Sequence, residues 1–189
     1  MEMLKPFGYD YEIFSNLELF KNKIRERLEI EPIIEEGSGK PWDYRAMLGV
    51  LFEEELRGYD MWGHTDFDCV YGNPDHFIPD SFLEKYDIYA NHIDYVSGPW
   101  SLYKNCEKVN NLFRKCDWKK YVLNPEPTGW VEMEFTEAAN ANVNIKYVLY
   151  QTRDWDNFST LRRVGNELYE GNQEVFMAHF RRTKEYPDV

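Results

Sequence analysis

The spacing of hydrophobic positions divides the first part of the chain into short elements. Short apolar runs predict strands over residues 9–16 and 31–36. Apolar side chains at three- and four-residue intervals predict helices over about 16–29 and 42–57. The segment YDMWGHT, residues 59–65, then predicts another strand. The order strand–helix–strand–helix–strand is typical of a mostly parallel sheet with helical crossovers.

The rest of the chain continues with elements of both kinds. The expected elements are a helix over 80–85, strands over 86–93 and 99–105, helices over about 105–115 and 130–142, and a strand over 144–150. The apolar segment NELYEGNQEVFMAHF contains Gly171-Asn172, a pair that favours a hairpin turn. We therefore expect one α/β domain over residues 1–189, with a mostly parallel central sheet flanked by helices and a C-terminal hairpin. The pattern is equally compatible with the first domain of a longer polypeptide.

Charge and composition exclude some classes of protein. The chain carries 34 acidic and 22 basic side chains, for a formal net charge of −12. A nucleic-acid-binding protein needs a positive field, so we expect no nucleic-acid partner. No apolar run approaches the roughly 20 residues of a membrane span, and no signal segment is visible. Three cysteines without zinc-like spacing favour reduced thiols and a cytoplasmic location.

Two aspartates follow the strand expected at 59–65. Asp66 and Asp68 are separated by one residue. They stand at the carboxyl end of the expected strand, where a parallel sheet of this kind binds ligands. Two carboxylates at a loop can both face Mn²⁺ or Mg²⁺, which take oxygen ligands and bridge them to phosphates. The same pair fits an ordinary turn, because Asp is common in turns. A second copy, Asp154 and Asp156, falls in a polar stretch more typical of a loop.

The segment AHFRRTKEY near the end of the sequence holds a second group of candidates. His179 ends an apolar strand, and a neutral imidazole can complete a metal shell. Arg182 and Lys184 follow it and can neutralise phosphate oxygens. A solvated basic tail is the plain alternative.

Together these motifs resemble the GT-A-fold nucleotide-sugar glycosyltransferases. In the retaining branch related to glycogenin, a terminal H-F-x-G-x-T-K-P-W segment binds metal and phosphate. HFRRTKEY is similar to it, with one residue fewer and without its Gly and Pro-Trp.

The resemblance is closer to a bacterial and viral group that includes a glycosyltransferase domain of large algal viruses (chloroviruses). Its pattern, roughly D-F-K-P-A-Y-G, a helix, then F-W-G-H-x-D-x-D-V-x-Y-G, is similar to residues 43–72 nearly position for position. A further S-G-x-x-x-L-x-x-N segment is similar to SGPWSLYKN, residues 97–105. The resemblance covers about 41–115 and the His-Phe segment.

This resemblance implies a metal-dependent enzyme that moves a hexose or deoxyhexose from a UDP-sugar to a glycan acceptor, and we expect the transfer to proceed with retention. Asp68 and His179 would bind Mn²⁺ or Mg²⁺, and Asp66 would complete the metal shell or contact the ribose. The residues implied in donor binding are Asp43, Arg45, Asp66, Ser97, Gly98, Arg182 and Lys184. Each has an alternative without a ligand: Asp43 and Arg45 also fit a helix-surface ion pair, and Ser97-Gly98 also fits an ordinary turn.

Two further residues have both a functional and a plain interpretation. Glu137 stands where the related enzymes carry an acidic residue near the reacting sugar, but it also fits a solvated helix position. His64 lies two residues before Asp66 and so points to the same side of the strand, either supporting the aspartates or buried in the core.

Two other functions use the same residues. A metal-dependent phosphohydrolase would employ the same carboxylates, and a non-catalytic carbohydrate-binding module is compatible with the Trp and Tyr content. The first would cleave its substrate fully without an acceptor, and the second would bind glycans without metal.

Overall fold

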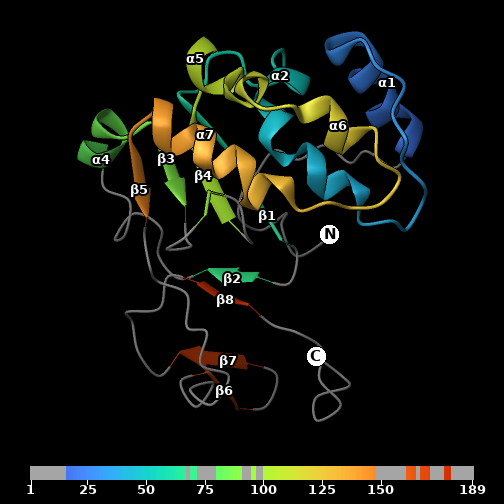
Figure 1. Cartoon of the computed structure of the whole chain (residues 1–189). Helices are drawn as coiled ribbons and strands as arrows, with labels where there is room; N and C mark the ends of the chain where they lie inside the picture. The colour runs from blue at the N-terminus through green and yellow to red at the C-terminus, as the bar shows by residue number, and fades with distance from the viewer. Residues whose placement is uncertain are drawn as a thin grey trace.

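The structure is a computed structural model (Figure 1). It describes residues 16–66, 69–71, 80–90, 95–96, 100–147, 161–164, 167–170 and 177–179. The strand expected at 9–16 falls outside these ranges except for its last residue.

A four-stranded sheet lies at the centre of the fold. Its strands are β1 (Met61–Thr65), β4 (Trp100–Lys104), β3 (Ile88–Ala90) and β5 (Ile145–Tyr147), in the order β1-β4-β3-β5. β4 pairs antiparallel with both β1 and β3, and only β3 and β5 pair parallel. The α/β class is therefore confirmed, but the expected mostly parallel sheet is wrong: the sheet is mixed and mostly antiparallel.

Two features explain the difference. Residues 31–36 form no strand; Ile34 is buried but Ile33 is exposed, so the pair anchors a connecting segment instead of lying between two strands. The connection from β3 to β4 spans only residues 91–99, which is shorter than the dozen or so residues that a parallel crossover needs.

Helix α1 (Leu17–Leu28) confirms the first predicted helix. The Asn16 side chain caps it by accepting a hydrogen bond from the Glu18 N–H at 2.7 Å. The second predicted helix, 42–57, is replaced by the 3₁₀ helix η2 (Lys40–Met47), the short α2 (Leu48–Leu51) and turns.

The remaining helical segments are short, and α5, η3, α6, η4 and α7 pack around one core. They are α4 (Asp80–Lys85), α5 (Glu107–Asn110), η3 (Leu112–Lys115), α6 (Trp118–Val122), η4 (Trp130–Glu132) and α7 (Glu134–Asn142). The largest fully buried apolar side chains are Trp130, Tyr44, Tyr89, Tyr103, Phe113, Phe135, Ile24, Met47, Leu51 and Ile88. In Figure 1, α5, α6 and α7 lie together with α1 and α2, whereas α4 stands apart from them at the left of the view.

Two smaller sheets lie apart from the central one in Figure 1. β2 (Cys69–Tyr71) pairs antiparallel with β8 (Met177–His179), and β6 (Leu161–Val164) pairs antiparallel with β7 (Glu167–Glu170). A C-terminal hairpin is thus present, but the one expected around Gly171-Asn172 is wrong, because β7 pairs with the strand before it and β8 pairs with β2.

No helix in the described ranges combines the length and the apolar character that a bilayer crossing requires.

A hydrogen bond between Tyr121 and Glu134 joins α6 to the start of α7. The Tyr121 hydroxyl donates to one oxygen of the Glu134 carboxylate, and the Asp117 N–H donates to the other at 2.9 Å. These bonds, the Tyr121 bond first, hold the pKa of Glu134 below its usual value of 4.5.

Tyr121→Phe is therefore expected to lower the melting temperature near neutral pH. A carboxyl with a lowered pKa stabilises the fold fully above its unfolded pKa and loses that contribution as pH falls through the folded value. The difference between wild type and variant should hence shrink as pH falls below about 4.5. Thermal melts across this range check it, and a difference that grew with acidity would contradict it.

Candidate functional site

Strand β1 delivers Asp66 from a firmly held position. Trp62 is buried in its middle, stacks on Tyr103 of β4 with ring centroids 4.2 Å apart, and donates from Nε1 to Asn110 Oδ1 at 2.8 Å. The ring of His64 lies 5.9 Å from the same Tyr103 ring. Because β1 is anchored from both β4 and α5, Asp66 leaves the sheet from a rigid element, as a precise site requires.

The 3₁₀ form of η2 separates its side chains into an inner and an outer row. Residues three apart eclipse one another in a 3₁₀ helix. Lys40 and Asp43 accordingly form a buried row, while Trp42 and Arg45 form a row that reaches the surface. The Arg45 guanidinium lies 5.8 Å from the centroid of the Trp42 ring.

The outer row meets the end of β1 through an ion pair. Arg45 donates from its guanidinium to a carboxylate oxygen of Asp66, and both side chains are mostly buried, at 15% and 27% exposure. The structure thus brings together two residues that the sequence analysis placed in one site. Arg45 does not pair with its sequence neighbour Asp43 as the plain alternative supposed, since Asp43 pairs with Lys40.

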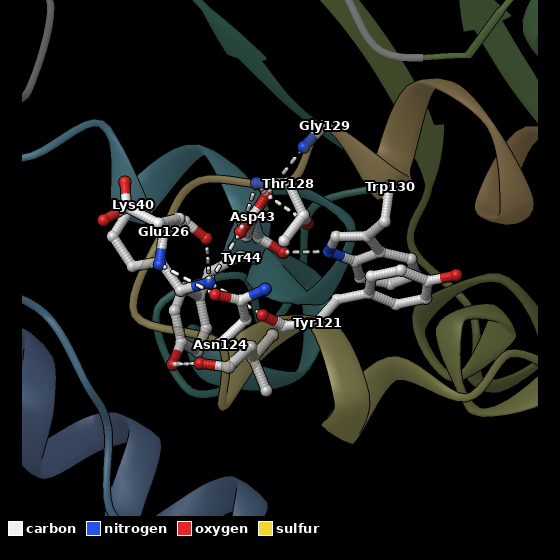
Figure 2. A network of polar contacts seen from close by, with 10 residues as sticks. Lys40, Asp43, Tyr44, Tyr121, Asn124, Glu126, Thr128, Gly129 and Trp130 are labelled. Atoms are coloured by element: carbon white, nitrogen blue, oxygen red, sulfur yellow. Dashed lines mark hydrogen bonds and ion pairs between the residues drawn. The ribbon is translucent and has the colours of Figure 1, made fainter.

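The inner row is a buried clamp between η2 and the segment that precedes η4 (Figure 2). Lys40 is fully buried, and its Nζ donates to Asp43 Oδ2 at 2.8 Å, to the carbonyl of Tyr121 at 2.7 Å and to that of Glu126 at 3.1 Å. These bonds use all three protons of the ammonium group.

The carboxylate of Asp43 is equally well satisfied. It accepts hydrogen bonds from the N–H and hydroxyl of Thr128 and from the N–H of Gly129, at 3.1–3.2 Å. Its main-chain carbonyl accepts from Trp130 Nε1 at 3.0 Å. Asp43 therefore lies beneath the surface, where it supports the turn that carries Arg45; its contact with a donor stays a prediction.

Glu132, at the end of η4, adds a second carboxylate beside the ion pair. Partial removal from water raises its pKa, with the negative charge of Asp66 acting in the same direction and the positive charge of Arg45 opposing both. The mutual influence places these three charges in one neighbourhood. η4 packs against η2, which keeps Glu132 there.

The β2–β8 pair places His179 opposite Cys69. Cys69 lies opposite His179 in the antiparallel register, and Cys69 directly follows Asp68. Paired positions in such a ladder lie about 4.5–5.5 Å apart at their Cα atoms. The backbone of His179 is hence next to that of Cys69, although more than half of the chain separates the two, and Asp68 precedes Cys69 in the sequence.

Glu137 lies exposed on α7, one residue after Thr136, which contacts Val96. The Val96 N–H donates to the hydroxyl of Thr136 at 2.9 Å, and Ser101 donates to the Val96 carbonyl. Val96 and Thr136 are the direct neighbours of Ser97 and Glu137 in the sequence. The structure therefore holds Val96 against Thr136, while the position of Ser97 and Gly98 relative to Glu137 stays a prediction.

Several predicted site residues lie outside the described ranges: Asp68, Ser97, Gly98, Arg182 and Lys184. Within the described ranges, no three His, Cys, Asp or Glu side chains gather closely enough to hold a metal ion. The predicted metal set contains Asp68, which lies outside these ranges, so this set stays a prediction.

The sequence analysis missed the roles of Lys40, Trp42 and Glu132. Two signals favour a 3₁₀ turn here. Pro41 stands at the start of the segment, and an interval of three residues joins Lys40 to Asp43 and Trp42 to Arg45. Nothing in the sequence pointed to Glu132, because its place depends on the packing of η4 on η2.

Residues 12–186 match a protein family described as a family of unknown function, DUF6625. The chain belongs to DUF6625. No curated protein and no solved structure matches this DUF6625 chain.

Proposed function

We propose that this DUF6625 protein is a metal-dependent glycosyltransferase of GT-A-like fold. It transfers a hexose or deoxyhexose from a UDP-sugar to a glycan acceptor with retention. Three residues, Asp66, Asp68 and His179, hold Mn²⁺ or Mg²⁺ in this proposal.

The register of β2 and β8 is the observation that carries it. Asp66-x-Asp68 and His179 were selected from the sequence separately, from segments far apart along the chain. The pairing of Cys69 with His179 brings those segments together. A turn and a solvated tail with no common role have no reason to meet in this way.

The donor atoms of these residues suit the proposed metals. Carboxylate oxygens are the preferred ligands of Mg²⁺ and Mn²⁺, and imidazole nitrogen is a common additional ligand. Asp66 is accessible enough to exchange part of its pairing with Arg45 for a ligand. When bound, such an ion neutralises the charge of a diphosphate leaving group.

The side chains of the protein supply binding and charge. Arg45, held by the clamp below it, faces the same space as Asp66 and is positioned to contact phosphate or sugar oxygens of the donor. Lys184, with Arg182, stabilises the departing UDP as its negative charge grows. Ser97, Gly98 and Glu137 line the sugar, and Glu137 orients the acceptor.

The reaction itself is a simple exchange of bonds at the anomeric carbon. The bond from this carbon to the β-phosphate oxygen breaks, and a bond to the acceptor oxygen forms. The electron pair of the broken bond leaves with UDP, and the proton of the acceptor hydroxyl passes to the UDP phosphate or to solvent. Holding both partners in place supplies much of the rate enhancement.

Calorimetric titration of UDP-, GDP- and CMP-sugars tests the proposal, first with Mn²⁺ and then with EDTA. We expect one UDP-sugar to bind with Mn²⁺ and to lose its binding in EDTA. Asp68→Ala should abolish this binding, because the metal loses a carboxylate ligand.

Asp156→Ala is the matched control, because Asp154 and Asp156 form the second D-x-D of the chain. It should leave binding unchanged. Nucleotide binding that ignores EDTA and Asp68→Ala would overturn the metal site. Full hydrolysis of the donor without an acceptor, as opposed to slow leakage to water, would identify a phosphohydrolase instead.

A further inference from the structure

Trp42 is an exposed aromatic side chain held in a fixed position beside the site. It is 63% exposed, whereas Trp62, Trp118 and Trp130 are buried. Its six-membered ring lies against Gly39, where even a Cβ would come within 3.4 Å of the ring, and the Arg45 guanidinium lies 5.8 Å from its centroid. Trp has one of the largest apolar surfaces of any side chain, so a ligand that covers this ring would bury a large contact area.

The charges around Trp42 favour a neutral ligand. The positive charge of Arg45 is already paired with Asp66, and Glu132 adds a second negative charge to the same neighbourhood. An anionic group on the Trp42 face would be repelled by this excess and by the net charge of −12. A sugar ring is uncharged, offers C–H groups to the indole face, and offers hydroxyl groups to carboxylates and guanidinium.

The place of Trp42 also favours a ligand next to the donor. Arg45 contacts Asp66 with its guanidinium and faces Trp42 with the same group. A ring stacked on Trp42 is thus separated from Asp66 by a single side chain, that of Arg45. Met133, which directly follows η4 and is 59% exposed, gives this packed pair of 3₁₀ helices a second exposed apolar side chain.

We propose that Trp42 is the stacking platform for a sugar ring of the acceptor glycan, with Glu132 accepting hydrogen bonds from the hydroxyl groups of that ring. The identification of this sugar as the acceptor rests on the proposed function. The platform needs no rearrangement on binding, because Gly39 and Arg45 already fix the ring, and this lowers the entropic cost of binding.

Saturation-transfer difference NMR tests the proposal with a panel of di- and trisaccharides of glucose, galactose, mannose and rhamnose, with UDP and Mg²⁺ present. At least one saccharide should bind the wild type. Trp42→Ala should weaken that binding by about tenfold or more, because an aromatic contact and its buried area are lost. Glu132→Gln should weaken it less, since an amide still accepts a hydrogen bond.

Tyr59→Ala is the matched control. Tyr59 is 64% exposed, as Trp42 is, but it lies just before β1, at the end of that strand opposite Asp66. This variant should bind the saccharide as the wild type does. If no saccharide binds the wild type, or if Trp42→Ala binds as well as Tyr59→Ala, the platform is refuted.

Calorimetric titration of UDP with Mg²⁺ into the same variants separates this inference from the proposed function. Trp42→Ala should retain the UDP affinity of the wild type; a parallel loss would mean that Trp42 stacks on the nucleotide base, and the acceptor platform would fall. If UDP does not bind even the wild type while a saccharide still binds through Trp42, the transferase proposal fails but the saccharide surface stands.

Discussion

Lys40→Met is expected to lower the free energy of unfolding by about 3–5 kcal/mol. The substitution keeps most of the side-chain volume but removes the charge that faces Asp43, which is 1% exposed. A buried carboxylate without its cation keeps the cost of leaving water and loses the attraction that compensates it. The carbonyls of Tyr121 and Glu126 lose a donor as well. Urea unfolding of the purified variant measures the change.

Arg27→Met is the control for this experiment. Arg27 also pairs with carboxylates, Glu53 at 3.1 Å and Glu54 at 2.8 Å, but both partners are exposed, so its loss should cost less than about 1 kcal/mol. The double variant Lys40→Met/Asp43→Leu should recover only part of the lost stability, because the N–H groups of Thr128 and Gly129 then lack an acceptor. A cost for Lys40→Met no larger than that for Arg27→Met would show that the clamp contributes little.

Gly63→Ala is expected to destabilise the fold by about 2–3 kcal/mol, near the upper end for overpacking. A Cβ at this position would lie 2.5 Å from the main-chain carbonyl oxygen of Ser101 on β4. Because the obstacle is backbone, rotation of a side chain cannot relieve the contact, and β1 has to move away from β4. Urea unfolding reports the stability. The metal-linked UDP affinity should fall too, since Asp66 follows β1 directly.

Gly37→Ala separates steric contact from the general effect of replacing a glycine. Gly37 has φ of 76° and no neighbouring atom within 4 Å of the added Cβ. Its replacement should cost only the left-handed backbone conformation, about 1 kcal/mol, with UDP affinity unchanged. Equal losses at the two positions would argue against the close approach of β1 and β4.

The sequence predicted elements better than it predicted their pairing. Helix α1, helix α4 and strands β1, β3 and β4 lie where the hydrophobic spacing placed them, because that spacing reports local burial. The direction of a strand depends on partners elsewhere in the chain. The short connection between β3 and β4 was the one local sign of an antiparallel pair.

The position of the C-terminal hairpin shows a similar limit. Near the end of the sequence the dipeptide Gly-Asn stands at 165–166 as well as at 171–172, and the spacing favours a hairpin turn at either. The observed hairpin pairs the strands on either side of the first copy. The second copy makes no hairpin because β8 pairs with β2 instead of β7, and β2 lies far away in the sequence.

The motifs of the candidate site could be predicted from the sequence, but the buried contacts that support them could not. Asp66 and Arg45 were selected from the sequence, and the structure pairs them. The helical spacing over 42–57 placed Asp43 on a helix surface beside Arg45. Its actual burial follows from the 3₁₀ form of η2 and from a loop some eighty residues away, which hydrophobic spacing does not report.

The pairing of β2 with β8 also has a consequence for the order of folding. Contacts between distant segments form late, because closing a long loop costs entropy before any contact compensates it. The helices and the central sheet can form from residues synthesised before β8 leaves the ribosome. A nascent chain is therefore expected to acquire its core first and to form the β2–β8 pair only when β8 docks.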